Sequence, residues 1–166
     1  MDSPQRLALA PGVQQFVESM GLYFEHVEMP RIAGRILGLL IVADRPLSLD
    51  DMAAALHISR ASASTNIRQA VHIGAAQPVS IPGDRHDYYR LADDIWEHHL
   101  TRGIRLTTAL RRIAEEGLAV LDGDDAAGPR LQEMRDFCDF TLAQLTATMA
   151  RWREHRGSGA TTASAR

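Results

Sequence analysis

The sequence predicts a mostly α-helical protein, and three observations support this fold class. Apolar residues recur at three- and four-residue spacing over most of the chain, which is the period of a helix with one buried face. In the centre, two short segments of this kind are separated by a tight turn and followed by a hairpin-like stretch around a Pro-Gly pair. Longer helical segments precede and follow this centre, so we expect it to be flanked by helices.

The first helix is predicted to begin at Pro11 and to stop before Pro30, which can open a second helix that runs to about Ala43. The second helix holds Gly34 and Gly38 four residues apart. Each glycine costs a helix about 1 kcal/mol relative to alanine, so two on one face predict close packing against another backbone. The apolar face expected for the first helix consists of Val13, Phe16, Val17, Met20, Phe24 and Val27.

The third and fourth helices carry start signals in the sequence. Ser48 and Asp51 form a capping-box pattern at the start of the third, and Ser59 is placed to cap the fourth, which runs to Ile73 and is closed by Gly74. The serine- and alanine-rich start of the fourth helix has the composition of a linker, but its periodicity is helical. The expected buried stripes are Leu49, Met52, Ala53 and Leu56 in the third helix, and Ala63, Ile67, Ala70 and Val71 in the fourth.

The pattern then changes to two short strands, 79–81 and 88–91, around a charged turn at Gly83. Because residues 75–78 are less hydrophobic than expected for the entry to a hairpin, we expect the first strand to be short. A long helix follows from about Asp94 to Leu121, and a last helix begins at Pro129 after a loop. Apolar residues expected to form a seam along these two helices are Trp96, Leu100, Leu110, Ala114, Leu121, Leu131, Met134, Cys138, Leu145 and Trp152.

The order of these elements indicates a winged helix-turn-helix with a small two-stranded wing. Along the chain they are a capped helix, a three-residue turn, a helix with small polar residues, a glycine that ends it, and a hairpin with an arginine at its tip. We expect the winged helix-turn-helix to be flanked by N- and C-terminal dimerisation helices. The predicted division is an N-terminal dimerisation helix (1–29), a winged helix-turn-helix DNA-binding domain (30–92), a C-terminal helical hairpin for dimerisation (93–156) and a disordered tail (157–166).

The fourth helix has the residues that a DNA recognition helix needs. The major groove is about 12 Å wide, so the exposed face of such a helix must carry small or extended polar side chains. Arg85, at the hairpin tip, can enter the adjacent minor groove or bind its phosphates. Arg31 and Arg35 can touch phosphates, or they can pair with Glu25, Glu28 or another acidic residue. The side chains expected on the DNA face of the helix are Ser59, Arg60, Ser62, Ser64, Thr65, Arg68 and Gln69.

The charge distribution agrees with a local anion-binding face. The formal net charge is −3, and all 18 basic residues are arginine, which suits bidentate recognition of phosphate or guanine. Residues 57–90 hold four arginines and two aspartates, a balance of +2, so the remainder of the chain carries −5.

Residues 30–69 resemble the GbsR-like branch of the MarR-type bacterial transcription regulators, and the likeness extends through the hairpin to Leu91. The features that carry it are Arg31 with Gly34-Arg35 and Gly38, Asp44-Arg45-Pro46, Ile58-Ser59-Arg60, Ser64-Thr65-Asn66 and Arg68. The resemblance implies a homodimeric winged-helix repressor or activator, with the recognition helix and wing on DNA and the terminal helices at the dimer interface.

A homodimer is also expected on physical grounds, because the flanking helices carry more apolar surface than one subunit can cover. Two copies would place two recognition helices one DNA turn apart on a pseudo-palindromic site. We therefore predict a DNA-binding transcriptional regulator, a repressor of its promoter, modulated by a small-molecule effector as a further option. The alternative is a winged-helix protein-interaction module without DNA binding.

Other sites have weaker support in the sequence. The seven histidines lack metal-ligand spacing, so we expect neither a metal site nor another cofactor, and no motif of an enzyme is present. The single cysteine, Cys138, is expected to be a buried thiol. Phe16, Tyr23, Phe24 and Trp96 either line an effector cavity or pack in the core or dimer interface.

The localisation expected from the sequence is cytoplasmic, without a membrane partner. The first 11 residues contain no apolar segment typical of a signal peptide. The most apolar run, 36–43, is much shorter than the roughly 20 residues that span a bilayer.

Overall fold

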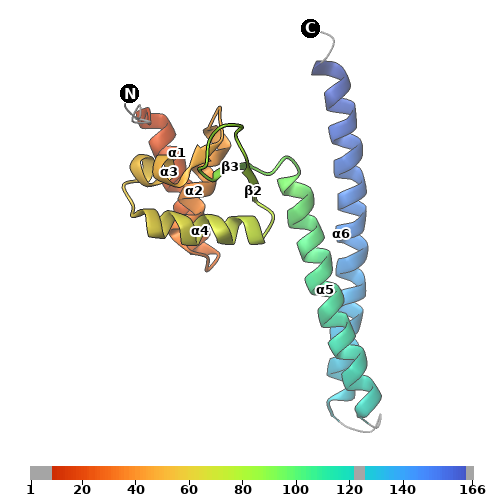
Figure 1. Ribbon diagram of the computed structural model, residues 1–166. Helices are drawn as coiled ribbons and strands as arrows, with labels where there is room; N and C mark the ends of the chain where they lie inside the picture. Colours follow the sequence, from red (N-terminus) through yellow and green to blue (C-terminus); the bar gives the residue numbers. More distant parts are fainter. Residues whose placement is uncertain (1–8, 122–125, 164–166) are drawn as a thin grey trace. The chain divides into compact units, whose positions relative to one another are not determined.

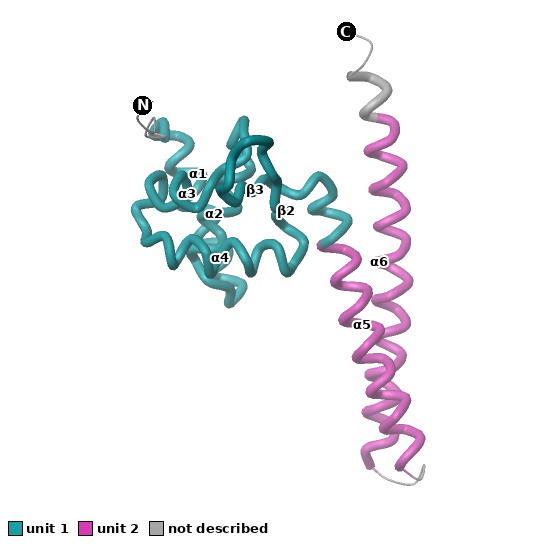
Figure 2. The backbone as a smooth tube through the Cα atoms, in the orientation of Figure 1, with its two compact units in different colours: residues 1–98 teal, residues 99–166 magenta. Residues whose placement is uncertain are grey.

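The computed structural model describes residues 9–121 and 126–163, with side chains to residue 158. The described chain divides into two compact units, residues 1–98 and 99–166, which are coloured separately in Figure 2. Helices dominate both units, and a small antiparallel sheet lies in the first, as Figure 1 shows. The predicted fold class, mostly α-helical with a winged helix-turn-helix, is confirmed.

The first unit begins with two helices that pack through glycine. A Cβ on Gly34 would lie 2.5 Å from the backbone oxygen of Met20, and a Cβ on Gly38 would lie 3.0 Å from the Cβ of Met20. The close approach predicted from the glycine spacing is therefore present. Val17 and Phe24 are buried as expected, whereas Phe16 and Val27 are exposed. The elements of this unit are α1 (Pro11–His26), α2 (Arg31–Val42), β1 (Leu47–Ser48), α3 (Leu49–Leu56), α4 (Arg60–His72), β2 (Ala76–Val79) and β3 (Tyr88–Leu91).

The caps of α3 and α4 follow the sequence signals. The Oγ of Ser48 accepts from the backbone N–H of Asp51, and the carboxylate of Asp51 accepts from the N–H of Ser48, so the capping box is complete. The Oγ of Ser59 accepts from the N–H of Ser62 at the start of α4. Three residues join α3 to α4, and the first of them, His57, has φ +53°. This left-handed conformation turns the chain sharply between the two helices.

The sheet has the order β1-β3-β2, with Ser48 opposite Tyr88 and Val79 also opposite Tyr88. Two sequence predictions are corrected here. The strand expected at 79–81 is β2, four residues that end at Val79, because the weakly hydrophobic segment 76–78 pairs with β3. Pro78 is tolerated there since β2 is an edge strand. Strand β1 was not predicted because two residues cannot display an alternating pattern.

The core of the first unit lies among α1–α4 and the base of the wing. Most of the stripes predicted for α3 and α4 are in it. The polar residue Asn66 is also buried, at 9% exposure, and its Nδ2 donates to the carbonyl of Ser62 one turn earlier. The largest fully buried side chains in this unit are Val17, Ile36, Leu39, Leu47, Met52, Leu56 and Ile67.

The second unit is a hairpin of two long helices, α5 (Ile95–Val120, whose first turn belongs to the first unit) and α6 (Gly128–Ala163). A Cβ on Gly117 would lie 3.0 Å from Leu131 Cδ1, so a glycine of α5 lets α6 approach closely. Ala114 and Cys138 are fully buried, which confirms the expected buried thiol. Other positions of the predicted seam are exposed to solvent; Leu110, for example, is 41% exposed.

The C-terminal segment differs from expectation. We expected disorder from residue 157, but α6 continues to Ala163, while residues 164–166 lie outside the described chain. Adding residues to an existing helix costs far less than starting one, because only nucleation fixes several residues for a single hydrogen bond. The long α6 can therefore extend into a glycine- and serine-containing sequence.

Candidate nucleic-acid interface

Helix α4 has one buried face and one face that carries most of its polar side chains. Ala63, Ile67 and Ala70 are buried against the rest of the first unit. Seven side chains were expected on the DNA face. Ser59, Arg60, Thr65 and Arg68 are exposed, and Ser62, Ser64 and Gln69 are half-buried. The outer face of α4 is therefore narrow and polar, with its two arginines as the long side chains.

The two arginines of α4 are already engaged in weak contacts. The Nε of Arg60 lies 3.1 Å from a carboxylate oxygen of Asp50 on α3, and both side chains are more than 60% exposed. The Nε of Arg68 donates to the carbonyl of Ser64, 3.2 Å away, which leaves its terminal nitrogens outside that bond. Exposed pairs of this kind contribute at most about 1 kcal/mol, so either arginine can exchange its partner for a phosphate or base.

The wing follows α4 and presents Arg85 in the turn between β2 and β3, where it is exposed. The turn is held by Asp84, whose carboxylate accepts from the backbone N–H and ring of His86 and from the Tyr88 hydroxyl at 2.7 Å. These bonds hold the pKa of Asp84 below its usual value, and the bond to Asp84 raises the pKa of Tyr88. Gly83, with φ +85°, begins the turn in a conformation that glycine adopts readily.

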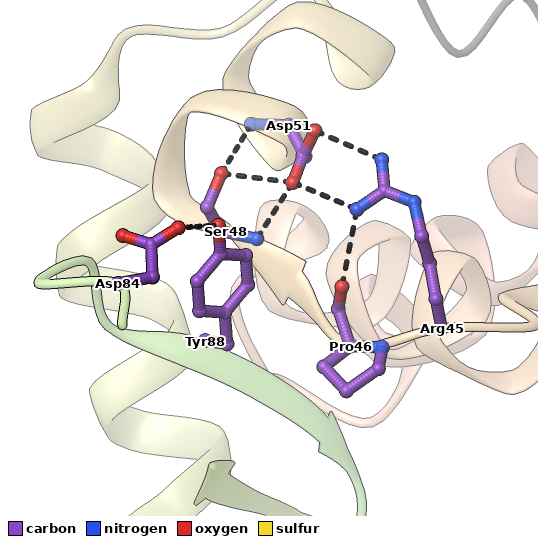
Figure 3. A network of polar contacts seen from close by, with 6 residues as sticks. All are labelled: Arg45, Pro46, Ser48, Asp51, Asp84 and Tyr88. Carbon is purple, nitrogen blue, oxygen red and sulfur yellow. Dashed lines mark hydrogen bonds and ion pairs between the residues drawn. The ribbon is translucent and has the colours of Figure 1, made fainter. Parts of the chain in front are cut away.

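A second polar cluster lies at the start of α3, close to the wing strand (Figure 3). Arg45 donates to both carboxylate oxygens of Asp51, at 3.3 and 3.1 Å, and to the carbonyl of Pro46. Partial burial acts to raise the pKa of Asp51, but the bonds from Arg45 and Ser48 outweigh it and keep the pKa below its ordinary value. The cluster fixes the start of α3, and the pairing of Ser48 with Tyr88 places that start next to β3, which joins the helix-turn-helix to the wing.

Arg31 and Arg35 are paired within the protein. The terminal nitrogens of Arg31 lie 3.1 Å from Glu18 and 3.8 Å from Glu25, and the Nε of Arg35 lies 2.7 Å from Glu18. Of the two alternatives, the ion pairs are therefore present in the structure, with the expected Glu25 as one partner of Arg31 and Glu18 as the acidic residue that both arginines share. The sequence did not single out Glu18, because the choice among the acidic residues of α1 depends on how α1 packs on α2.

The other candidate sites can be placed as well. Among the described residues, no group of three or more histidine, cysteine, aspartate or glutamate side chains is arranged to hold a metal ion. Of the aromatic residues considered for an effector cavity, Phe24 belongs to the core, whereas Tyr23 and Trp96 are each 59% exposed and Phe16 is 37% exposed. No helix in the described ranges is long and apolar enough to cross a membrane.

Comparison with known proteins supplies the context for this interface. The chain is 32% identical over 158 residues to the HTH-type transcriptional regulator MmpR5 of Mycobacterium tuberculosis, and the match covers 94% of this chain and 96% of that protein. The family described as MmpR5-like MarR family transcriptional regulators matches residues 94–155. The chain belongs to the MarR family of transcriptional regulators. It is thus a DNA-binding regulator of transcription with a winged helix-turn-helix, in a family of regulators and not of enzymes.

Two further relatives agree with this assignment. A solved crystal structure described as a transcriptional regulator is 34% identical, has a TM-score of 0.76 and covers 87% of this chain and 99% of its own. The putative HTH-type transcriptional regulator YvaV of Bacillus subtilis is 22% identical over 139 residues, which are 75% of this chain and 78% of that protein.

Proposed function

We propose that the protein binds a pseudo-palindromic promoter site as a homodimer and represses transcription from that promoter. The observation that carries the proposal is the outer face of α4, where Arg60 and Arg68 stand on either side of small residues and the wing arginine, Arg85, follows in the next exposed turn. A groove-entering helix needs this combination of slim and extended side chains. A site that overlaps a promoter blocks polymerase, which is why we assign repression.

The roles of the individual residues follow from their chemistry. Arg68 would donate two hydrogen bonds to a guanine, and Thr65 or Gln69 would reach a neighbouring base edge. Arg60 and the free N–H groups at the start of α4 would bind phosphate next to Ser59. The remaining small residues, Ser62 and Ser64, would line the closest approach to the groove. Arg85 would bind the adjacent minor groove or its phosphates.

Dimerisation is supported by the apolar surface of the second unit. Leu106, Ile113, Phe137 and Phe140 are each more than half exposed. Burial of one such side chain contributes about 1.5–3 kcal/mol, so leaving all four in water would be costly. A second copy of α5 and α6 is the partner that a regulator of pseudo-palindromic DNA requires.

The remaining parts of the proposal concern organisation and location. We assign residues 1–29 and 93–156 to dimerisation and residues 30–92 to DNA binding. The assignment to the GbsR-like branch stays a prediction that rests on residues 30–69. We assign the protein to the cytoplasm, because bacterial promoters lie there. A small-molecule effector would act by changing the affinity of the protein for DNA.

Selection of genomic fragments with the purified full-length protein tests this function. We expect enriched fragments from promoter regions, with two half-sites about one DNA turn, or 10–10.5 base pairs, apart. The Arg68→Ala variant, taken through the same selection, should enrich them poorly. Recovery of no enriched fragment by the wild-type protein at moderate salt would overturn the proposal and would favour a winged helix that binds another protein.

A further inference from the structure

Arg35 connects three helices from a largely buried position. It lies on α2 with 20% of its side chain exposed. Its Nη2 donates to the carbonyl of Leu56 on α3 at 3.0 Å, and its Nε lies 2.7 Å from Glu18 on α1. The contact with Glu18 is an ion pair without hydrogen-bond geometry at Nε. The guanidinium is therefore directed at two other helices and is largely shielded from solvent.

The carbonyl that Arg35 binds is at a sensitive point of the helix-turn-helix. Leu56 is the last residue of α3, and the last carbonyls of a helix have no partner within the helix. A cation there satisfies the carbonyl and also interacts favourably with the helix dipole. The next residue, His57, makes the left-handed turn that leads to Ser59, the cap of α4. Arg35 thus fixes the C-terminal end of α3, and the position of that end determines where the turn leads the chain into α4.

A glycine on α1 makes room for this side chain. A Cβ on Gly21 would lie 2.7 Å from Cγ of Arg35, closer than two carbon atoms can approach without a shift. The stem of Arg35 therefore crosses α1 at the one position of that turn without a side chain. This contact with α1 and the ion pair to Glu18 restrict the side chain that donates to Leu56.

We propose that Arg35 is a positioning residue for DNA recognition, which acts by fixing the turn between α3 and α4 and does not bind phosphate. This inference rests on the proposed function, in which α4 enters the major groove. Arg31 is its matched control, because it lies one turn earlier on α2 and bonds to the same Glu18. Arg31 is 46% exposed, and its ion pairs reach only α1.

The test compares binding to two DNA duplexes. One is a promoter fragment recovered in the genomic selection, and the other is a scrambled duplex of the same length and composition. The Arg35→Met variant keeps an unbranched side chain of similar length but removes the charge and the hydrogen-bond donors. We expect its ratio of affinities, promoter fragment over scrambled duplex, to fall about tenfold, which is the effect of losing one charge-assisted hydrogen bond. Affinity for the scrambled duplex should stay within about twofold of wild type, because non-specific binding depends on phosphate contacts. Arg31→Met should leave the ratio unchanged.

Each other outcome overturns the inference. If Arg35 binds phosphate, Arg35→Met will weaken both duplexes in parallel, and the slope of log K against log salt will become shallower by about 0.9. If its role is only structural, the melting temperature will fall while the affinity ratio at 20 °C, below the melting transition, stays at the wild-type value.

Two further variants keep the test informative. Should Arg35→Met fail to fold, Arg35→Lys retains the charge on a single nitrogen, which cannot reach Leu56 and Glu18 from two separate atoms as the guanidinium does. An affinity ratio equal to that of wild type in Arg35→Lys would contradict the need for both contacts. Arg68→Ala separates the inference from the function it rests on. If wild type does not discriminate the duplexes, the proposed function fails; if Arg68→Ala loses discrimination and Arg35→Met keeps it, only the role of Arg35 fails.

Discussion

Replacement of Gly34 by alanine should destabilise the first unit, although alanine is the better helix former. The added Cβ would lie 2.5 Å from the backbone oxygen of Met20 and 2.7 Å from Cβ and Cγ of Phe24. The oxygen belongs to the backbone of α1 and cannot rotate away, so α1 and α2 must separate. Since α2 also packs against α3 and α4, a shift of α2 away from α1 disturbs the core on which the helix-turn-helix rests.

The magnitude follows from two opposing terms. Alanine in a helix interior gains about 1 kcal/mol over glycine. Overpacking of a close contact costs about 1–3 kcal/mol and occasionally more, and a clash with backbone belongs at the upper end. We therefore expect Gly34→Ala to lower the free energy of unfolding by about 2 kcal/mol.

Urea denaturation followed by circular dichroism measures this change. With a slope of about 2 kcal/mol per molar urea, the midpoint should fall by about 1 M. Gly12→Ala is the control, because it lies in the first turn of α1 and an added Cβ there meets nothing within 4 Å. That variant should be as stable as wild type or slightly more stable. A Gly34→Ala midpoint equal to or above that of wild type would refute the argument that the glycine is needed for helix contact.

Three further predictions concern the turn, the DNA face and the dimer. Asp50→Asn should raise the affinity for the promoter fragment about two- to fivefold, measured by fluorescence anisotropy, because Arg60 no longer has to leave its ion pair with Asp50. An unchanged affinity would mean that this ion pair does not compete with DNA. His57→Gly should stabilise the protein by up to about 1 kcal/mol in urea denaturation, since glycine adopts a φ near +53° without steric cost. A loss of stability in this variant would contradict the claim that the left-handed φ of His57 is strained. Phe137→Glu should abolish the proposed dimer, so that the variant sediments as a monomer in analytical ultracentrifugation where the wild-type protein sediments as a dimer; equal sedimentation of the two proteins would exclude Phe137 from the proposed interface.

The parts of the fold that local chemistry determines could be predicted from the sequence. The capping box of Ser48 and the cap at Ser59 depend on residues within three positions of each other, and the structure has both. The glycine spacing of α2 likewise predicted a close helix contact, but only the structure identifies α1 as the partner. Strand β1 escaped prediction, because it is too short for a pattern and exists through its pairing with β3.

The candidate site shows the same division. The outward residues of α4 could be assigned from helical periodicity, because the buried stripe leaves one face free. The ion pairs of Arg60 and Arg35 could not, since each joins residues on different helices. Asp50 lies 10 residues before its partner Arg60, and Glu18 lies 17 residues before Arg35. Such pairs depend on how the helices pack, which the sequence pattern does not specify.

The salt dependence of DNA binding tests the central claim, that α4 binds the DNA groove and its phosphates, most directly. The affinity of the wild-type protein for the recovered promoter fragment should fall linearly with log salt concentration. In the double variant Arg60→Ala, Arg68→Ala the affinity should drop at least tenfold at fixed salt, and the slope should become shallower by about 0.9 for each phosphate that is no longer neutralised. A double variant with the affinity and slope of wild type would contradict the assignment of α4 as the recognition helix.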